Sequence, residues 1–436
     1  MGYEKRIVTN EINGDSYIYV KHPSGLDILI WKKEGFTTTE ALFGTKYGSV
    51  NNRFKTVDDD EYIEVPEGIA HFLEHKLFEN EDTDVFELYA QTGAMGNAYT
   101  SFAETVYLFN CSENYDKSLR ILLSFVQKPY FTDESVAKEQ GIIGQEIKMG
   151  LDNPERKSFF NLLNCLYVNH PIKIDIAGTV ESIAKITPEL LYKCYNTFYN
   201  LHNMCLAIAG NLDVDEVLKI CDEELIPVAD YKLDASVVEE PEEIACDEMC
   251  EEFPVGMPIF NIGYKCKAYS GYELLKNEYI ASIMMQLVVG NTSKLYNDLT
   301  DEGLINSNFG FEVFWGSDSM FCLIISGESK DPKTVRRRIE EEIERLKRDG
   351  LDKDEFEIIR KSRYGSLVKS FDSVDTCAEY LLNAQFVGVD VFDMQKALQE
   401  VTFDEVQNGL YKFFDKSKSA ISIIVPSRKQ KGECDA

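Results

Sequence analysis

The sequence predicts an α+β fold made of two similar domains, each an antiparallel sheet with helices packed on one face. Three observations favour this fold. Strand-like and helix-like segments alternate along the chain, the second half repeats the pattern of the first, and 436 residues suffice for two or three domains. Hydrophobic residues form 44% of the chain, which supplies a core and excludes global disorder.

The elements of the first half follow from local patterns. β-like runs lie at residues 16–20, 26–31, 41–50, 97–103, 105–110 and 204–209. Pro23-Ser24-Gly25 separates the first two runs as a hairpin turn would. Apolar residues at three- and four-residue spacing in residues 119–126 predict a helix between the later strands.

The second half echoes the first. Residues 186–210 resemble residues 401–425, because each segment begins with a threonine-led helix start, continues to two aromatic residues and ends in a strand. We therefore predict an N-terminal domain at residues 1–228, an acidic linker at 229–256 and a C-terminal domain of the same fold at 257–436. The linker is interpreted as a solvated segment or as an acidic wall that faces a basic ligand.

The net charge limits the classes of partner that the chain is expected to bind. The chain carries 45 Lys+Arg and 75 Asp+Glu, a net charge of −30, which argues against binding to nucleic acid or to anionic membranes. The most apolar stretch, residues 280–289, is about half a bilayer span and contains Gln286, so no membrane helix is expected.

The N-terminus shows no apolar signal core. Eleven scattered cysteines indicate reduced thiols and a cytoplasmic location.

One pentapeptide contains candidate zinc ligands and a candidate general base. Residues 71–75 read His-Phe-Leu-Glu-His, and Pro66 just upstream is a typical helix-starting residue. On a helix, His71 and His75 lie one turn apart on the same side and can bind one zinc ion. Glu74 then lies beside the metal, where a carboxylate can act as general base. The alternative is that both histidines are ordinary residues of an amphipathic helix.

A catalytic zinc needs a third protein ligand, and two glutamates are candidates. A predicted helix at residues 133–149 contains Glu139 and Glu146, which lie about two turns apart and therefore on the same face. One can bind the metal while the other orients a ligand from outside. The spacing leaves open which glutamate does which.

Several motifs together resemble the pitrilysin/insulinase family of zinc peptidases. They are Gly68 to His75, which contains the inverzincin motif, Gly96 to Ser101, the two glutamates, and Gly210-Asn211. The resemblance is greatest to the short bacterial members, whose two domains form one half of a clamshell. It implies that His71, His75 and Glu146 bind zinc, that Glu74 is the catalytic base and that Glu139 is a supporting carboxylate.

The resemblance also implies a substrate site. Asn97, Ala98 and Tyr99 would lie on an edge strand to which an extended peptide adds as a further strand, and an exposed edge offers the main-chain hydrogen bonds that this requires.

The second half departs from the pattern of an active metal-binding half. Residues 283–287, the counterpart of the metal helix, contain neither His nor Glu, so a single metal site is expected. Thr300 and Asn306 stand where active members carry an Arg and a Tyr that stabilise the oxyanion. Losing one oxyanion donor typically costs about 100- to 1,000-fold in turnover. A partner chain is therefore expected to supply these groups, which favours a heterodimer over a homodimer.

The sequence thus predicts the zinc-bearing subunit of a dimeric endopeptidase that cleaves peptides or small unfolded polypeptides inside a closed chamber. The alternative is a non-catalytic scaffold or partner-binding subunit of the same fold. Retention of His71, His75 and both glutamates favours the enzyme.

Overall fold

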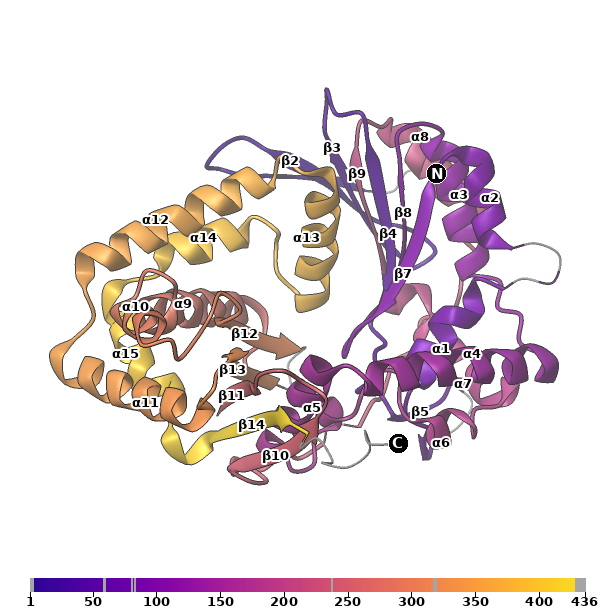
Figure 1. Ribbon diagram of the computed structural model, residues 1–436. Coiled ribbons are helices and arrows are strands. Elements are labelled where there is room, and N and C mark those ends of the chain that lie inside the picture. The colour runs from indigo at the N-terminus through magenta and orange to yellow at the C-terminus, as the bar shows by residue number, and fades with distance from the viewer. Residues whose placement is uncertain are drawn as a thin grey trace, which may run out of the picture. The chain divides into compact units, whose positions relative to one another are not determined.

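The computed structural model describes residues 4–57, 60–79, 81, 84–236, 238–316 and 320–427 (Figure 1). Its mixture of sheets and covering helices confirms the α+β fold class. The described chain divides into two compact units. Unit 1 takes the residues up to 147, 174–236 and 365–395, and unit 2 takes 148–173, 238–364 and 396–427.

The described part of unit 1 contains a seven-stranded sheet in the order β1-β2-β3-β9-β4-β8-β7. Its strands are β1 (Lys5–Thr9), β2 (Ser16–Lys21), β3 (Asp27–Lys32), β4 (Thr39–Thr45), β7 (Met95–Thr100), β8 (Thr105–Cys111) and β9 (Met204–Gly210). Neighbouring strands are antiparallel apart from the parallel pair β3 and β9. The runs predicted at residues 16–20, 26–31, 105–110 and 204–209 are confirmed as strands. A short hairpin of β5 (Arg53–Lys55) and β6 (Tyr62–Glu64) lies apart from this sheet.

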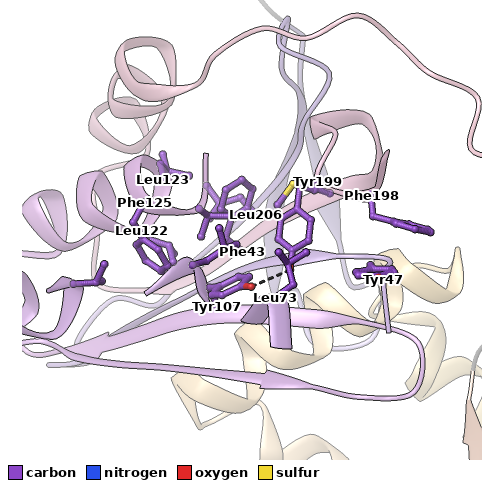
Figure 2. Close-up of a cluster of buried hydrophobic side chains, with 14 of the residues drawn as sticks. Phe43, Tyr47, Leu73, Tyr107, Leu122, Leu123, Phe125, Phe198, Tyr199 and Leu206 are labelled. Carbon is purple, nitrogen blue, oxygen red and sulfur yellow. Dashed lines mark hydrogen bonds between the residues drawn. The ribbon is translucent and has the colours of Figure 1, made fainter. Parts of the chain in front are cut away.

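Helices cover the sheet of unit 1 and enclose its core. They are α1 (Ile69–Leu77), α2 (Val85–Thr92), α3 (Tyr115–Val126), α4 (Asp133–Leu151), α6 (Val180–Ile183), α7 (Pro188–Phe198) and α8 (Val214–Glu224), and the last turn of α4 belongs to unit 2. Figure 2 shows Phe43 and Tyr107 of the sheet packed with Leu122 of α3 and Leu73 of α1. The Tyr107 hydroxyl lies 2.9 Å from the Tyr199 hydroxyl, which satisfies both buried groups.

In its described residues, unit 2 contains a five-stranded sheet in the order β10-β14-β11-β13-β12. Its strands are β10 (Glu248–Phe253), β11 (Ile259–Cys266), β12 (Gly310–Gly316), β13 (Met320–Glu328) and β14 (Ser419–Pro426). Only β10 and β14 are parallel among these pairs. Its helices are α9 (Gly271–Val289), α10 (Lys294–Asp301), α11 (Pro332–Asp349), α12 (Lys353–Ser370), α14 (Asp393–Glu400) and α15 (Phe403–Phe413), with α12 and α14 crossing the unit boundary.

Each unit also receives one helix from the other half of the sequence. Helix α13 (Val374–Val387) packs on β4 and β9 of unit 1, and α5 (Pro154–Leu166) packs on β11 and β14 of unit 2. Helix α13 lies over Gly44, whose neighbour Phe43 faces the main core, so it covers the opposite face of that sheet. The division at residues 228 and 257 stays a prediction, and repetition of sequence pattern does not reveal this exchange of helices.

The acidic segment is partly ordered as a strand. Strand β10 lies within residues 229–256, and along it exposed residues alternate with half-buried ones. An alternating, charged strand is suited to the edge of a sheet, because its charges face water and discourage pairing with other chains.

No helix in the described parts of the chain is long and apolar enough to cross a membrane.

Candidate metal centre

Helix α1 carries the pentapeptide and begins at a turn that requires glycine. Gly68 has φ 86°, and a Cβ atom on it would lie 2.4 Å from the carbonyl oxygen of Ala177, so only glycine fits there without a shift. Phe72 and Leu73 are buried in the core of unit 1. Burial of this apolar face fixes the rotation of the helix about its axis.

Three potential ligand atoms converge between α1 and α4. His71 Nε2 lies 3.6 Å from one carboxylate oxygen of Glu146, and His75 Nε2 lies 3.7 Å from the other. The chosen ligand atoms of the three residues all lie within 4.8 Å of one another. A tetrahedral zinc ion with bonds of about 2.0–2.1 Å separates its ligand atoms by about 3.3 Å. The donor set of two imidazole nitrogens and one carboxylate therefore fits zinc in type and spacing.

Glu139 contacts the other nitrogen of His75. Its Oε1 lies 2.9 Å from His75 Nδ1, and the Glu139 side chain is buried. Accepting the Nδ1 hydrogen would orient the ring and leave Nε2 facing Glu146. Burial opposes protonation of His75, but the Glu139 hydrogen bond and the charges of Glu74, Glu139 and Glu146 outweigh it, so the pKa of His75 is raised.

Glu74 lies next to this cluster in a buried position, with 8% of the residue exposed. The Thr100 hydroxyl donates a hydrogen bond of 2.7 Å to Glu74 Oε2. Burial raises the pKa of Glu74, and the charge of Glu146 adds to this, whereas Thr100 and His75 oppose it. A carboxylate of raised pKa is a stronger base than an ordinary one, as proton abstraction requires. The sequence assigned no role to Thr100, although it lies within the quoted Gly96 to Ser101 motif.

Asn97, Ala98 and Tyr99 lie on β7, which is an edge strand among the described residues and pairs with β8. Asn97 is exposed, and Tyr99 is half-buried on the opposite side of the strand from Ala98. The Tyr99 hydroxyl donates to Glu379 of α13 at 3.2 Å. The strand reaches the cluster through Thr100, so the predicted substrate strand and Glu74 are adjacent in unit 1.

Thr300 and Asn306 belong to unit 2, and their side chains have local partners. The Thr300 hydroxyl donates to the Tyr296 carbonyl at 2.8 Å, and the Asn306 amide donates to Glu328 at 2.6 Å.

Comparisons with known proteins identify the family of this chain. The insulinase (peptidase family M16) model matches residues 61–180, which contain the whole cluster, and the M16 inactive-domain model matches residues 185–363. The uncharacterized zinc protease YmfH of Bacillus subtilis is 36% identical over 417 residues, covering 94% of this chain and 97% of its own.

Solved structures share the fold over nearly the whole chain. An M16-like peptidase from Alicyclobacillus acidocaldarius superimposes with a TM-score of 0.89 and 32% identity, covering 98% of this chain and 99% of its own. Pitrilysin superimposes with a TM-score of 0.75 and 15% identity, and the match covers 98% of this chain but 47% of pitrilysin. That likeness shows the fold alone. On the sequence identity and the family matches, the chain belongs to the insulinase family of M16 peptidases.

Proposed function

We propose that this chain is a zinc-dependent endopeptidase that cleaves peptides or small unfolded polypeptides. The observation that carries the proposal is the convergence of His71, His75 and Glu146 on one point beside buried Glu74. Relatives named zinc protease support the same chemistry.

His71, His75 and Glu146 would hold the zinc, and Glu139 would orient His75. When bound, zinc would act as a Lewis acid on the scissile carbonyl. Glu74 takes a proton from the attacking water, and its raised pKa suits both this step and the later return of the proton to the leaving amine. Thr100 holds the Glu74 carboxylate in position through its hydroxyl.

Strand β7 would bind the substrate as an added strand. Asn97, Ala98 and Tyr99 lie on a sheet edge, so their main-chain groups can pair with a peptide of almost any sequence. Thr100 on the same strand contacts Glu74, which would bring a bound peptide next to the base.

A dimer would complete the enzyme. Thr300 and Asn306 replace the expected Arg and Tyr, and both side chains are engaged locally. We therefore favour a heterodimer whose second family member supplies the oxyanion donors and closes a chamber, with a homodimer as the alternative. The scattered cysteines support a cytoplasmic location.

A non-catalytic scaffold is the competing function, and the absence of the Arg and Tyr from positions 300 and 306 favours it. Metal content separates the two. We expect about one zinc per purified chain by plasma mass spectrometry, its loss in His71→Ala and its retention in His202→Ala, which alters a histidine outside the cluster. Wild-type protein without zinc would favour the scaffold.

Peptide cleavage tests the role of Glu74. Glu74→Gln should retain zinc but cleave about 100- to 10,000-fold more slowly than wild type, because general acid–base catalysis contributes that much. Glu87→Gln, on the exposed surface of α2, should cleave at the wild-type rate. Assays with and without candidate partner chains test the heterodimer, and full activity of a purified homodimer would contradict it.

A further inference from the structure

Residues 239–246 form a strap across the end of helix α5, within unit 2. Glu240 accepts hydrogen bonds from the backbone N–H groups of Val168, Asn169 and His170, at 2.8, 2.7 and 2.7 Å. These three residues follow the last turn of α5. The strap lies in the interval for which the sequence predicts a linker, and its Glu240 side chain is largely buried.

Lys265 of β11 also binds the strap. Its ammonium group donates to Glu240 at 2.5 Å and to the carbonyl oxygens of Pro241 and Glu243 at 2.7 and 2.9 Å. Only 7% of Lys265 is exposed. A buried charge of this kind needs such partners, so the ion pair holds the strap in one position.

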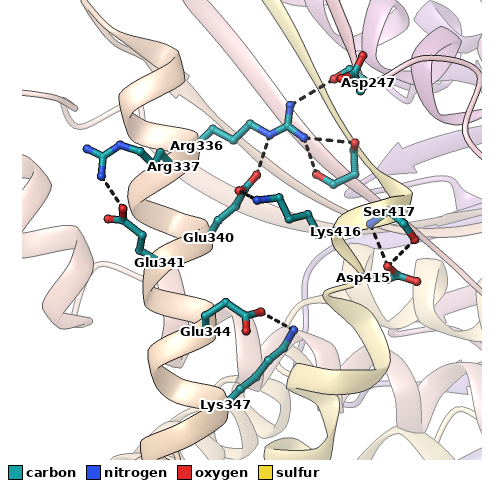
Figure 3. Close-up of polar contacts among 11 residues, drawn as sticks. Asp247, Arg336, Arg337, Glu340, Glu341, Glu344, Lys347, Asp415, Lys416 and Ser417 are labelled. Atoms are coloured by element: carbon teal, nitrogen blue, oxygen red, sulfur yellow. Dashed lines mark hydrogen bonds and ion pairs between the residues drawn. The ribbon is translucent and has the colours of Figure 1, made fainter.

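The far end of the strap reaches Cys165, near the end of α5. The backbone N–H groups of Ala245 and Cys246 donate to the Cys165 carbonyl at 2.8 and 3.1 Å. The next residue, Asp247, accepts through its carbonyl from the Ile421 N–H at 3.0 Å and from Arg336 at 3.3 Å (Figure 3). The backbone around Cys246 is therefore fixed on both sides.

Two thiols meet at this point. The backbone contact keeps the Cα atoms of Cys165 and Cys246 within about 7 Å, close to the range in which disulfides form. The Cys246 side chain is close enough to the Cys165 thiol to raise its pKa, although burial is the larger cause of the rise. Cys165 is buried and Cys246 is half-buried. No cysteine among the ten described is in a disulfide.

We propose that Cys165 and Cys246 are a redox-sensitive pair, which a small-molecule disulfide oxidises to a disulfide that locks the strap onto α5. The chain leaves unit 2 after residue 173 and returns at residue 238. Cys165 lies before this passage through unit 1 and Cys246 lies after it. The disulfide would therefore close the loop of chain that runs through unit 1.

The order of events follows from exposure. Cys246, the more accessible thiol, attacks glutathione disulfide and releases one glutathione, forming a mixed disulfide. The Cys165 sulfur then attacks the Cys246 sulfur, breaks the mixed bond and releases a second glutathione. The two thiols give up two electrons and two protons, and both pass to the released glutathiones. Burial raises the pKa of the Cys165 thiol, which suits Cys165 to the second attack rather than to the first.

Peptide mapping without reduction tests the proposal. The reduced, purified chain is incubated with glutathione disulfide, alkylated, digested and analysed by mass spectrometry. We expect a linked peptide containing Cys165 and Cys246 and a melting temperature several degrees higher, reversed by dithiothreitol, because the bond closes a loop of about 80 residues. A glutathione adduct on Cys246 without the link would overturn the proposal, and so would a link without a thermal shift.

Variants separate the two steps. Cys165→Ser should accumulate the glutathione adduct at Cys246, because the resolving thiol is gone, and should show no thermal shift. Cys250→Ser is the matched control, since Cys250 is exposed four residues along the chain, and it should behave like wild type. Should Cys165→Ser fail to fold, mapping of the wild-type protein and of Cys246→Ser still decides the outcome.

Discussion

Glu139 and Glu146 share one face of α4, yet they contact different nitrogens of His75. Glu146 lies 3.7 Å from Nε2, whereas Glu139 lies 2.9 Å from Nδ1. Glu146 also faces His71, at 3.6 Å, which makes it the better candidate for the third ligand. Sequence spacing alone left the two glutamates interchangeable.

Replacement of Glu139 tests its supporting role. Glu139→Gln should weaken zinc binding about 10- to 100-fold, because His75 loses a charged acceptor at Nδ1. Competition with a chelator of known affinity measures this change. Glu134→Gln, an exposed residue in the first turn of the same helix, should bind zinc like wild type. Equal affinities for the two variants would contradict the role.

Glu40 of β4 is a buried carboxyl group, with 6% of the residue exposed. Burial raises its pKa to about 8, and Asp375 and Glu379 of α13 add to the rise, while a hydrogen bond with Asn110 opposes it. The group therefore holds a proton at neutral pH in the folded state but not in the unfolded state, where its pKa is near 4.5.

The folded state binds more protons than the unfolded state between these two pKa values. Stability should therefore fall as pH rises from about 4.5 to about 8, with a slope from Glu40 of up to about 1.4 kcal/mol per pH unit. Glu40→Gln should remove this part of the slope in urea unfolding measured across that range. Glu34→Gln, which alters a highly exposed side chain, should keep it. Identical slopes for wild type and Glu40→Gln would show that Glu40 is ionised in the folded protein.

At the scale of elements, each of the two exchanged helices, α5 and α13, packs over a glycine of the sheet that it covers. Helix α13 lies over Gly44 of β4, and α5 lies over Gly263 of β11. A Cβ atom on Gly44 would approach Leu382 to 3.1 Å, and one on Gly263 would approach Leu166 to 2.7 Å. The missing side chain lets each helix lie close to its sheet.

Overpacking beneath α5 should therefore destabilise unit 2. Gly263→Ala should lower the free energy of unfolding by about 1–3 kcal/mol, the usual cost of an added methyl group in a packed core. Gly310→Ala is the control on β12 of the same sheet, where a Cβ atom would meet no atom within 4 Å. Denaturant unfolding of both variants checks the difference, and similar losses would mean that the close approach of α5 has no energetic role.

At the scale of the whole molecule, a net charge of −30 creates a field that acts on approaching peptides. If the proposed cleavage occurs, kcat/KM for a lysine-rich peptide should fall as salt rises from about 0.01 to 0.2 M, because added salt shortens the range of this attraction. A glutamate-rich peptide of equal length should show the opposite trend. Salt dependence of the same sign for both peptides would exclude electrostatic attraction as its cause.

Much of the fold could be predicted because it rests on local patterns. The strands near residues 16–31 and 105–110 and the helices α1, α3 and α4 follow from alternation, helical spacing and turn residues. Strand β1 and the short β5–β6 hairpin were not predicted. The residues of β1 and β6 are exposed or half-buried, and β5 is only three residues long, too short to show a periodic pattern although Phe54 is buried. The strap was expected to be solvated because its charge is evident, whereas its partners, Lys265 and the end of α5, lie elsewhere in the chain.

The sequence by itself determined the family. It also determined that His71 lies beside His75 and that Glu139 and Glu146 lie on one face, because positions four and seven apart on a helix share a face whatever the helix packs against. Only the tertiary structure decided which glutamate faces both histidines, that Thr100 contacts Glu74 and that Cys165 meets Cys246. These contacts join residues far apart in the chain, so they depend on how helices and strands pack and not on the local pattern that forms each element.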